Sequence, residues 1–420
     1  MRRGQHWRGR VRIRPAGIGS VCREEHDRLR QIIEEGSGAQ HLYGRQTMIR
    51  FLHLADLHLG WSPSFLEGDR RAARRRERDA ALRRAVDWAL REDVHFVLIA
   101  GDLFDSHAPG RGTAREAAEQ LARLERAGLR VITVPGNHDE ISYHNSIYRR
   151  EGDSWPGYLV TDPMPAHCLS FEVSGTSVHL YSMAYTGGVT NVSGLGQLPR
   201  LSEGGIHIGV FHGSLDWDAG ERSLPLSSRA LERAGYHYTA LGHIHRHQVT
   251  RVGGGLCCYA GMVEHKSLAE PGVGHLTIVS AADDEITLEK PPLPARDHRW
   301  ETIDVSPLSD QDELIRRCRE LANPEAVVGV QLRGAATFPL IPGQLQDALE
   351  GEFFHLEVKD DSSLVEGELA GRYENELTVR GQFVRDMTAR IRGAESAREE
   401  RVLKMALSLG LSAFVREGSP

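Results

Sequence analysis

Five short motifs of aspartate, histidine and asparagine follow one another along the chain, each directly after an apolar stretch of strand length. Their side chains offer the carboxylate, imidazole and amide atoms that bind divalent cations. Each motif alone would arise by chance, but five in succession indicate one shared site. The motifs are Asp56-Leu57-His58, Gly101-Asp102, Gly136-Asn137-His138-Asp139, Phe211-His212-Gly213 and Gly242-His243-Ile244-His245.

The spacing of these side chains predicts two neighbouring cations. Asp56 and His58 can bind one cation from a single turn, and His245 returns to the same cation. Asp102, with two carboxylate oxygens, is the predicted bridge. A mixed carboxylate and imidazole set favours Mn²⁺, Fe or Zn²⁺ over Mg²⁺ and Ca²⁺. The second cation is expected to take Asn137, His212 and His243.

Two such cations predict phosphoester hydrolysis. At about 3.5 to 4 Å apart they can hold a hydroxide between them at neutral pH and orient a phosphoryl group for in-line attack. His138 neighbours a ligand, so it points elsewhere and is the candidate acid for the leaving alkoxide, a role that contributes about 10² to 10⁴-fold. Asp139 is a second catalytic candidate because it could fix the tautomer of His138. A structural role for His138 is the alternative.

The motifs require a sheet whose strand ends converge. Strands are expected at 49–55 and 95–102, helices at about 70–92 and 113–127, and a third strand ends at 136. This alternation predicts a layered α/β domain with a substantial sheet. Later segments predict a hairpin turning at Ser174-Gly175, the strand 206–214, a helix near 226–234 and short strands separated by Gly-rich turns.

Composition divides the 420 residues into four segments. The arginine-rich 1–47 is expected to be a disordered extension or to precede a true start at Met48. A metal-site domain is expected over 48–292, followed by a Pro-containing joint. A small βαβαβ unit is expected over 298–360. A helical segment over 373–416 carries a stripe of Phe and Met that could close the protein's own core or dock a partner.

Whole-chain properties exclude several classes of protein. Five cysteines without C-x-x-C spacing argue against a disulfide framework or a thiolate zinc site. No apolar stretch approaches a membrane span, and the N-terminus lacks the apolar core of a secretory signal, so a cytoplasmic protein without a membrane partner is expected. The formal charge of −7 gives no global sign of nucleic-acid binding.

The block order resembles the calcineurin-like metallophosphoesterase superfamily over about residues 49–290. LHLADLHLG, IAGDLFDSHAP, VPGNHD, FHGS and LGHIH are most similar to its DNA-repair exonuclease branch of SbcD-like and YhaO-like proteins. The resemblance implies a four-layer αββα core, an α+β capping domain and C-terminal helices. It also implies Mn²⁺-dependent exonuclease and endonuclease activity on DNA in repair. A large coiled-coil SMC-like ATPase and a second copy of the chain are the protein partners it suggests.

The resemblance also implies that His138 is the acid. The metal ligands it implies are Asp56, His58, Asp102, Asn137, His212, His243 and His245. Asp105 departs from part of the branch, whose archaeal and eukaryotic members commonly have histidine there. SbcD-like proteins also have Asp at this point, and Asp105 is included as a catalytic candidate, with a loop-capping carboxylate as the alternative.

Three further residues are candidate substrate contacts: Arg71, Arg74 and His107. Arg71 and Arg74 lie in an arginine-rich helix just after the first motif, where they could track phosphates. The alternative is a solvated helix face paired with neighbouring acids. His107 is expected in a loop beside the site, with simple solvation as its alternative.

Two other functions remain open at this point. One keeps the chemistry but acts on cyclic nucleotides or other small phosphodiesters, whose enzymes generally lack a unit after residue 290. The other is a non-catalytic subunit of an SMC-like ATPase complex, which the complete ligand set argues against.

Overall fold

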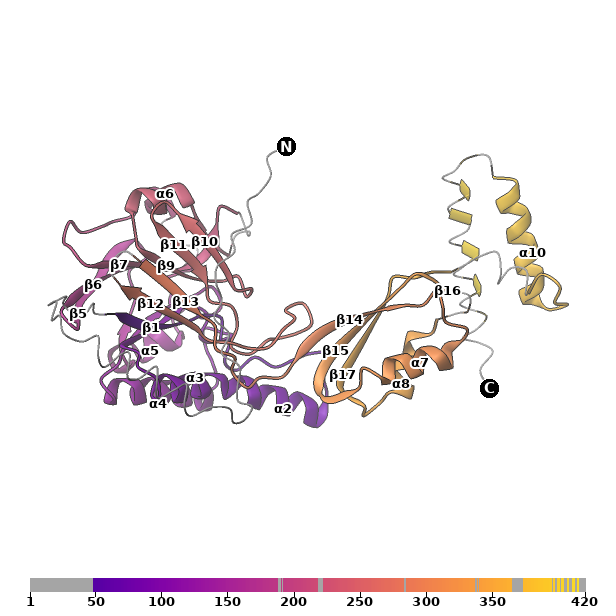
Figure 1. Cartoon of the computed structure of the whole chain (residues 1–420), viewed down its shortest axis with the longest axis horizontal. Coiled ribbons are helices and arrows are strands. Elements are labelled where there is room, and N and C mark those ends of the chain that lie inside the picture. Colours follow the sequence, from indigo (N-terminus) through magenta and orange to yellow (C-terminus); the bar gives the residue numbers. More distant parts are fainter. Residues whose placement is uncertain are drawn as a thin grey trace, which may run out of the picture. The chain divides into compact units, whose positions relative to one another are not determined.

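Two β-sheets pack face to face in the part of the chain that carries the five motifs (Figure 1). The computed structural model describes residues 48–187, 190, 192–217, 222–282, 285–336, 338, 340–364, 373–394, 396, 399–400, 402–403, 406–407, 410–411 and 414. The predicted extension 1–47 lies outside the described residues.

The first sheet has six strands, and its centre is parallel. Such strands are buried on both faces, which explains why their sequences are nearly continuous apolar runs. In spatial order they are β13 (Glu285–Glu289), β12 (Thr277–Ala282), β1 (Ile49–Leu54), β2 (Phe96–Ala100), β3 (Arg130–Val134) and β4 (Tyr158–Leu159).

The second sheet has seven strands. The predicted turn at Ser174-Gly175 joins β5 and β6 as an antiparallel hairpin. In spatial order the strands are β10 (Gln248–Val252), β11 (Gly255–Tyr259), β9 (Tyr238–Gly242), β7 (Ile206–Leu215), β6 (Thr176–Ser182) and β5 (Ala166–Val173), and β8 (Leu224–Leu226) pairs with β7.

Alternate residues of each strand face different layers. Leu52 and Leu54 of β1 pack beneath α3 (Ala81–Ala89) and α4 (Arg111–Arg126). Phe51 points the other way, into the core between the sheets. On the outer face of the second sheet, Phe211 and Leu241 pack with Leu231 of α6 (Ser228–Ala234). The domain is therefore a mixed α/β fold with two sheets between helices, as predicted.

The helix expected over 70–92 is divided in two. α2 (Gly68–Asp79) ends at Asp79 and α3 begins at Ala81, so that Ala80 alone separates them. Ala80 stays near helical geometry, with φ −81° and ψ −7°. Because alanine favours helices, the sequence does not indicate the break. α2 is instead held by tertiary contacts, because its fully buried Arg78 donates to the Leu57 carbonyl at 3.0 Å.

Residues after the Pro-containing joint form a separate small sheet with two helices. The order strand, helix, strand, helix, strand runs through 298–360, and all three strands are parallel. We call these residues the capping unit. Its elements are β14 (His298–Asp304), α7 (Gln311–Arg319), β15 (Asn323–Arg333), α8 (Pro342–Ala348) and β17 (Phe353–Asp360), and the short β16 (Ala335–Ala336) pairs with β18 (Ser363–Leu364).

The C-terminal segment contributes α10 (Val379–Arg392). Its Val384 and Met387 pack with Leu407 and Leu411 in a small apolar cluster. These side chains therefore close a local core. The remaining connections include α5 (Ile147–Arg150) and two short 3₁₀ turns, Gly152–Ser154 and Val192–Gly196.

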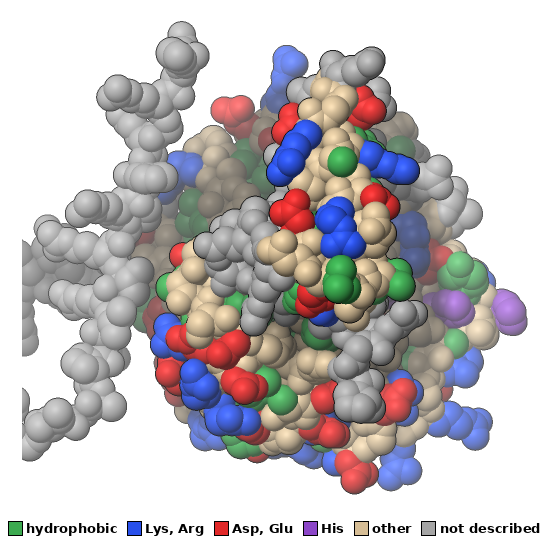
Figure 2. All heavy atoms as spheres, turned by 90° about the vertical axis from the view of Figure 1, so that its right-hand side faces the viewer, with side chains coloured by type: hydrophobic (Ala, Val, Ile, Leu, Met, Phe, Trp, Pro, Cys, Tyr) green, Lys and Arg blue, Asp and Glu red, His purple; other side chains and the backbone are tan. Residues whose placement is uncertain are grey.

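Charge is mixed on the face that Figure 2 presents, where basic and acidic side chains lie side by side. Among the described residues, no helix combines the length and apolar character needed to cross a bilayer.

Candidate metal centre

The five motifs meet at one edge of the paired sheets. β1, β2 and β3 are parallel neighbours, so their carboxyl ends lie together. Asp56, Asp102 and Asn137 follow these ends. In the second sheet β7 and β9 are also parallel, and His212 of β7 pairs with Gly242, just before His243. Strand order alone thus brings both halves of the predicted ligand set to one place.

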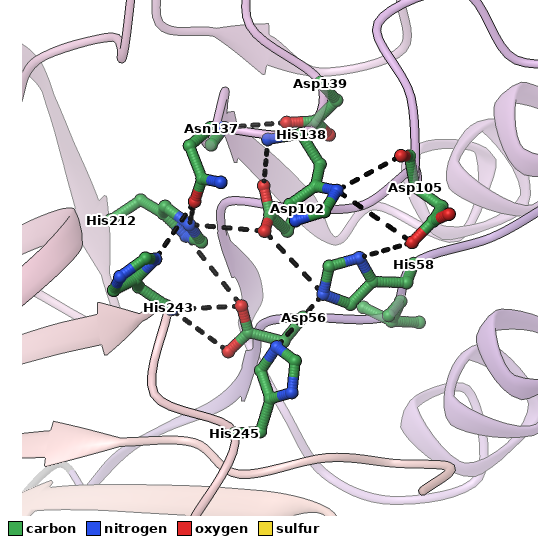
Figure 3. A network of polar contacts seen from close by, with 12 residues as sticks. Asp56, His58, Asp102, Asp105, Asn137, His138, Asp139, His212, His243 and His245 are labelled. Atoms are coloured by element: carbon green, nitrogen blue, oxygen red, sulfur yellow. Dashed lines mark hydrogen bonds and ion pairs between the residues drawn. The ribbon is translucent and has the colours of Figure 1, made fainter. Parts of the chain in front are cut away.

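The first group of ligand atoms comes from Asp56, His58 and His245. One atom from each lies within 4.8 Å of the others. The two histidines turn their Nε2 atoms toward one another at 3.1 Å (Figure 3). Each Nδ1 instead faces a carboxylate: Asp105 Oδ1 at 3.1 Å behind His58, and Glu270 behind His245. The carboxylates thus lie on the Nδ1 sides of the two rings, and both Nε2 atoms face one point, as cation binding requires.

The second group comes from Asn137, His212 and His243. Asn137 Oδ1 lies 2.9 Å from His212 Nε2 and 3.0 Å from His243 Nδ1 (Figure 3). His212 is fully buried, and its Nδ1–H donates to the Ala100 carbonyl at 2.9 Å. That bond leaves Nε2 as the ring nitrogen that faces the site.

Asp102 lies between the two groups. Its Oδ2 is 3.7 Å from His58 Nε2 and 3.4 Å from His212 Nε2. Its Oδ1 accepts the His138 backbone N–H at 2.9 Å. One carboxylate oxygen therefore faces both groups while the other fixes the loop, a position suited to a bridging ligand. The donor set fits two divalent cations.

Backbone strain concentrates at this site. Of the described residues, six other than glycine have positive φ, and four of them are predicted ligands. Such conformations cost of order 1 to 3 kcal/mol each and persist only where surrounding contacts impose them. The four ligands are Asp56 (φ 54°), His58 (46°), Asp102 (50°) and His243 (93°).

Protonation follows burial and neighbouring charge. Burial lowers the pKa of His58 to about 4, even though Asp105 and Asp102 favour the charged ring. Burial likewise lowers the pKa of His243 to about 4. For His212 burial acts in the same direction, but the adjacent Asp102 outweighs it and raises the pKa to about 9. His58 and His243 are therefore neutral at pH 7, the form that binds cations.

His138 lies at the open side of the site. Its side chain is 35% exposed, whereas Asp56, His58 and His212 are fully buried. Its Nδ1–H donates to the Asp105 carbonyl at 3.2 Å. The ring therefore meets solvent next to the ligand atoms, with Nδ1 held and Nε2 left for proton exchange.

Asp139 does not contact the His138 ring, whose tautomer it was expected to fix, whereas Asp105 contacts both His58 and His138. The Asp139 carboxylate turns from the His138 ring and accepts from the Gly136 N–H at 2.7 Å, the Phe104 N–H at 3.1 Å and Tyr148 Oη at 2.8 Å (Figure 3). It therefore stabilises the loop. Asp105 holds His58 through its carboxylate and His138 through its carbonyl. Both are positioning residues in this structure.

The three predicted substrate contacts differ from one another. Arg74 is fully buried and bonds Glu77, Glu264 and the His265 carbonyl, so the prediction of a phosphate contact is wrong for it. Arg71 is exposed, with its guanidinium on the Leu66 and Ser64 carbonyls. His107 stacks on Tyr143 with ring centroids 4.0 Å apart.

Two residues beside the site were not predicted. Glu270 bonds His245, and Lys266 Nζ lies 3.2 Å from Asp105 Oδ1. Both lie in the loop after β11, which follows no strand-end motif of the kind that marks the other residues. Neither residue fits the strand-end pattern that marks the other site residues.

Comparison with known proteins identifies the domain. Residues 49–247 match the family model of the calcineurin-like phosphoesterases. The chain is 27% identical over 278 residues to the uncharacterized metallophosphoesterase YhaO of Bacillus subtilis, covering 64% of this chain and 66% of YhaO. It is 25% identical over 219 residues to the DNA double-strand break repair protein Mre11 of Methanopyrus kandleri, covering 47% of this chain and 44% of that protein.

A longer match joins the chain to Mre11 of Haloferax volcanii, 24% identical over 380 residues, 86% of this chain and 75% of that protein. The matches to YhaO and the Methanopyrus protein span less than two thirds of those relatives. Among solved structures, a dimetal phosphatase from Danio rerio aligns with a TM-score of 0.34 at 15% identity, covering 58% of this chain and 95% of that one. Residues 49–247 therefore form a calcineurin-like phosphoesterase domain, of a family of metal-dependent hydrolases of phosphoester bonds.

Proposed function

We propose that this protein is a metal-dependent DNA phosphodiesterase of the repair-exonuclease type. The observation that carries the proposal is the pair of ligand groups on either side of Asp102 Oδ2. Two divalent cations there, with Mn²⁺ the first candidate and Fe or Zn²⁺ the alternatives, would supply a nucleophile from water at neutral pH and polarise the phosphoryl group.

The chain's own residues divide the remaining work. Asp102 holds the two ligand groups at a fixed separation and anchors the loop that carries His138. His138 is the acid that gives a proton from Nε2 to the leaving 3′ or 5′ alkoxide, because its Nδ1–H is already donated to the Asp105 carbonyl. Asp105 thereby orients the acid and one ligand, His58.

A DNA substrate is favoured by the extent of the similarity. The Haloferax relative, named as a DNA double-strand break repair protein, matches 86% of this chain, far more than residues 49–247 alone. Its likeness therefore includes residues outside the phosphoesterase motifs. A small phosphodiester would require only the catalytic domain. A coiled-coil SMC-like ATPase and a second copy of the chain are the protein partners we propose, with Arg71 and His107 as DNA contacts.

The test compares three substrates with Mn²⁺: linear DNA, a cyclic nucleotide and a chromogenic phosphodiester. Wild-type protein should cut DNA, and Asp102→Asn should cut none of the three because the two ligand groups lose their shared charge. Efficient turnover of the small substrates with DNA left intact would overturn the proposal. If the wild type cleaves none of them, the non-catalytic alternative replaces it.

A further inference from the structure

The loop after β11 reaches the site from behind the first ligand group. Glu270 in this loop bonds His245 Nδ1 through Oε1, and its Oε2 accepts the Lys266 backbone N–H at 3.0 Å. The Glu270 side chain is only 20% exposed. Both carboxylate oxygens are therefore engaged, which fixes the plane of the group that meets the imidazole.

Lys266 acts on the other histidine of the same group. Its ammonium lies 3.2 Å from Asp105 Oδ1, and that oxygen is 3.1 Å from His58 Nδ1. The Lys266 side chain is 16% exposed, and its Nζ lies 5.7 Å from the centroid of the Trp61 ring. The Lys266 ammonium thus positions the Asp105 carboxylate, which in turn positions His58.

We propose that the loop 264–270 is the positioning segment of the first cation position: Glu270 aligns His245, and Lys266 aligns His58 through Asp105. The inference rests on the proposed function for its importance in turnover, whereas cation binding itself can be measured without substrate. Neither Glu270 nor Lys266 lies within the matched residues 49–247.

The physical reason is control of ring orientation. A ligating histidine usually donates its other N–H to a carboxylate or carbonyl, and loss of that partner costs about 10- to 100-fold in metal affinity. His58 and His245 both have carboxylate partners, whereas His212 of the second group has a backbone carbonyl. Changes in this loop should therefore affect the first cation position and spare the second.

The loop itself is firmly attached. Glu264 at its start is buried and bonds Arg74 at 2.8 Å and Arg84 at 2.5 Å. The Leu268 carbonyl accepts the Trp300 indole N–H at 2.8 Å. These anchors hold Glu264 and Leu268 independently of Glu270, although Glu270→Ala also removes the acceptor of the Lys266 N–H.

The experiment is a Mn²⁺ titration of the full-length, metal-free chain by calorimetry. Wild type should bind two ions. Glu270→Ala should weaken one of the two sites about 10- to 100-fold and leave the other unchanged. Glu270→Gln keeps the size and an acceptor but lacks the charge, so its Mn²⁺ affinity should fall between those of wild type and Glu270→Ala. It replaces Glu270→Ala as the test if the alanine variant does not fold.

Glu357→Ala, an exposed glutamate of β17, is the matched control and should bind as wild type. Lys266→Met keeps an apolar stem but removes the ammonium, and it should weaken the same site as Glu270→Ala, by a smaller factor. Wild-type affinities in the Glu270 variants, or equal weakening of both sites, would overturn the inference. If Mn²⁺ binds as expected but DNA is not cut, the proposed function fails and this inference stands.

Discussion

Ring orientation sets three of the predicted ligand histidines apart, whereas the fourth, His243, turns Nδ1 toward Asn137. In His58, His212 and His245, Nδ1 faces an oxygen acceptor and Nε2 faces the site. His179, by contrast, has both nitrogens within the outer sheet, Nδ1 with Ser170 Oγ at 2.7 Å and Nε2 with the Gly204 carbonyl at 3.0 Å. A histidine with both nitrogens occupied has no lone pair available for a cation.

At His138 the proposal predicts a loss that depends on the leaving group. His138→Ala should lower kcat on DNA by about 10² to 10⁴-fold, because the departing alkoxide needs a proton. A nitrophenolate leaves readily without one, so the loss on a nitrophenyl phosphodiester should be much smaller. Steady-state rates on both substrates provide the measurement, and Mn²⁺ affinity is the control. Equal losses on both would remove His138 from the acid role.

The sequence predicted the side chains that follow strands and missed those that reach the site from elsewhere. Asp56, Asp102 and Asn137 could be found because the ends of parallel strands converge. Glu270 could not be predicted, since it reaches His245 from a loop whose path the sequence pattern does not reveal. Arg74 was misjudged because arginine is usually exposed, and only the folded chain shows the buried Glu264 that pairs with it.

At the scale of elements, the loop between β3 and α5 must pass very close to the one after β2. A Cβ on Gly136 would lie 2.3 Å from Asp102 Oδ1 and 2.5 Å from its backbone nitrogen. No side chain fits there without moving Asp102. The glycine is therefore required by the approach of two backbones.

Gly136→Ala should accordingly displace Asp102 and lower DNA cleavage by on the order of 10²-fold, the usual effect of a misplacement of about 1 Å. The matched control is Gly110→Ala at the start of α4, where an added Cβ meets nothing within 4 Å. Cleavage rates and Mn²⁺ titrations of both variants test the idea. Wild-type behaviour of Gly136→Ala would contradict this account of the loop.

The attachment of α2 depends on a buried ion pair. Glu264→Gln removes the charge that faces the fully buried Arg74 and the nearby Arg84. Breaking a buried pair on one side costs about 3 to 5 kcal/mol when the remaining charge has no other partner, and the cost should be smaller here because Arg74 keeps its ion pair with Glu77. We expect a clearly lower Tm in thermal unfolding. Glu357→Gln, an exposed change, should alter the free energy of unfolding by less than about 0.5 kcal/mol.

Periodicity predicted which elements exist, while packing decided where they end. The strands 49–55 and 95–102 were predicted from their apolar runs and appear as β1 and β2. The division of the expected helix at Ala80 had no signal, since alanine is a strong helix former. α2 is fixed by contacts with distant residues, such as that of Arg78 with the Leu57 carbonyl, which periodicity does not reveal.

At the scale of the whole molecule, the formal charge of −7 includes acids that serve the metal centre. Asp56, Asp102, Asp105 and Glu270 all lie at the ligand groups. Bound divalent cations reverse the local field where a phosphate must enter. Net charge is therefore a poor guide to whether this protein binds DNA.

Cation removal should lower stability by mass action. A ligand that binds only the folded state stabilises it by about 2.7 kcal/mol at a concentration 100 times its Kd. Each kilocalorie shifts the Tm of a domain of this size by about 2 to 4 °C. Adding EDTA should therefore lower the Tm, and excess Mn²⁺ should restore it. A Tm independent of both, with Asp102→Asn as the non-binding control, would contradict the predicted site.

Two backbone amides are themselves part of the metal centre. The His138 N–H is donated to Asp102, and the His243 N–H to Asp56 at 3.0 and 3.1 Å. Each bond ties a loop to the side chain of a different motif, so opening of the site must release these hydrogens to solvent. The deuterium uptake of these two amides consequently measures how often the site opens in metal-free protein and how much each added cation slows that opening.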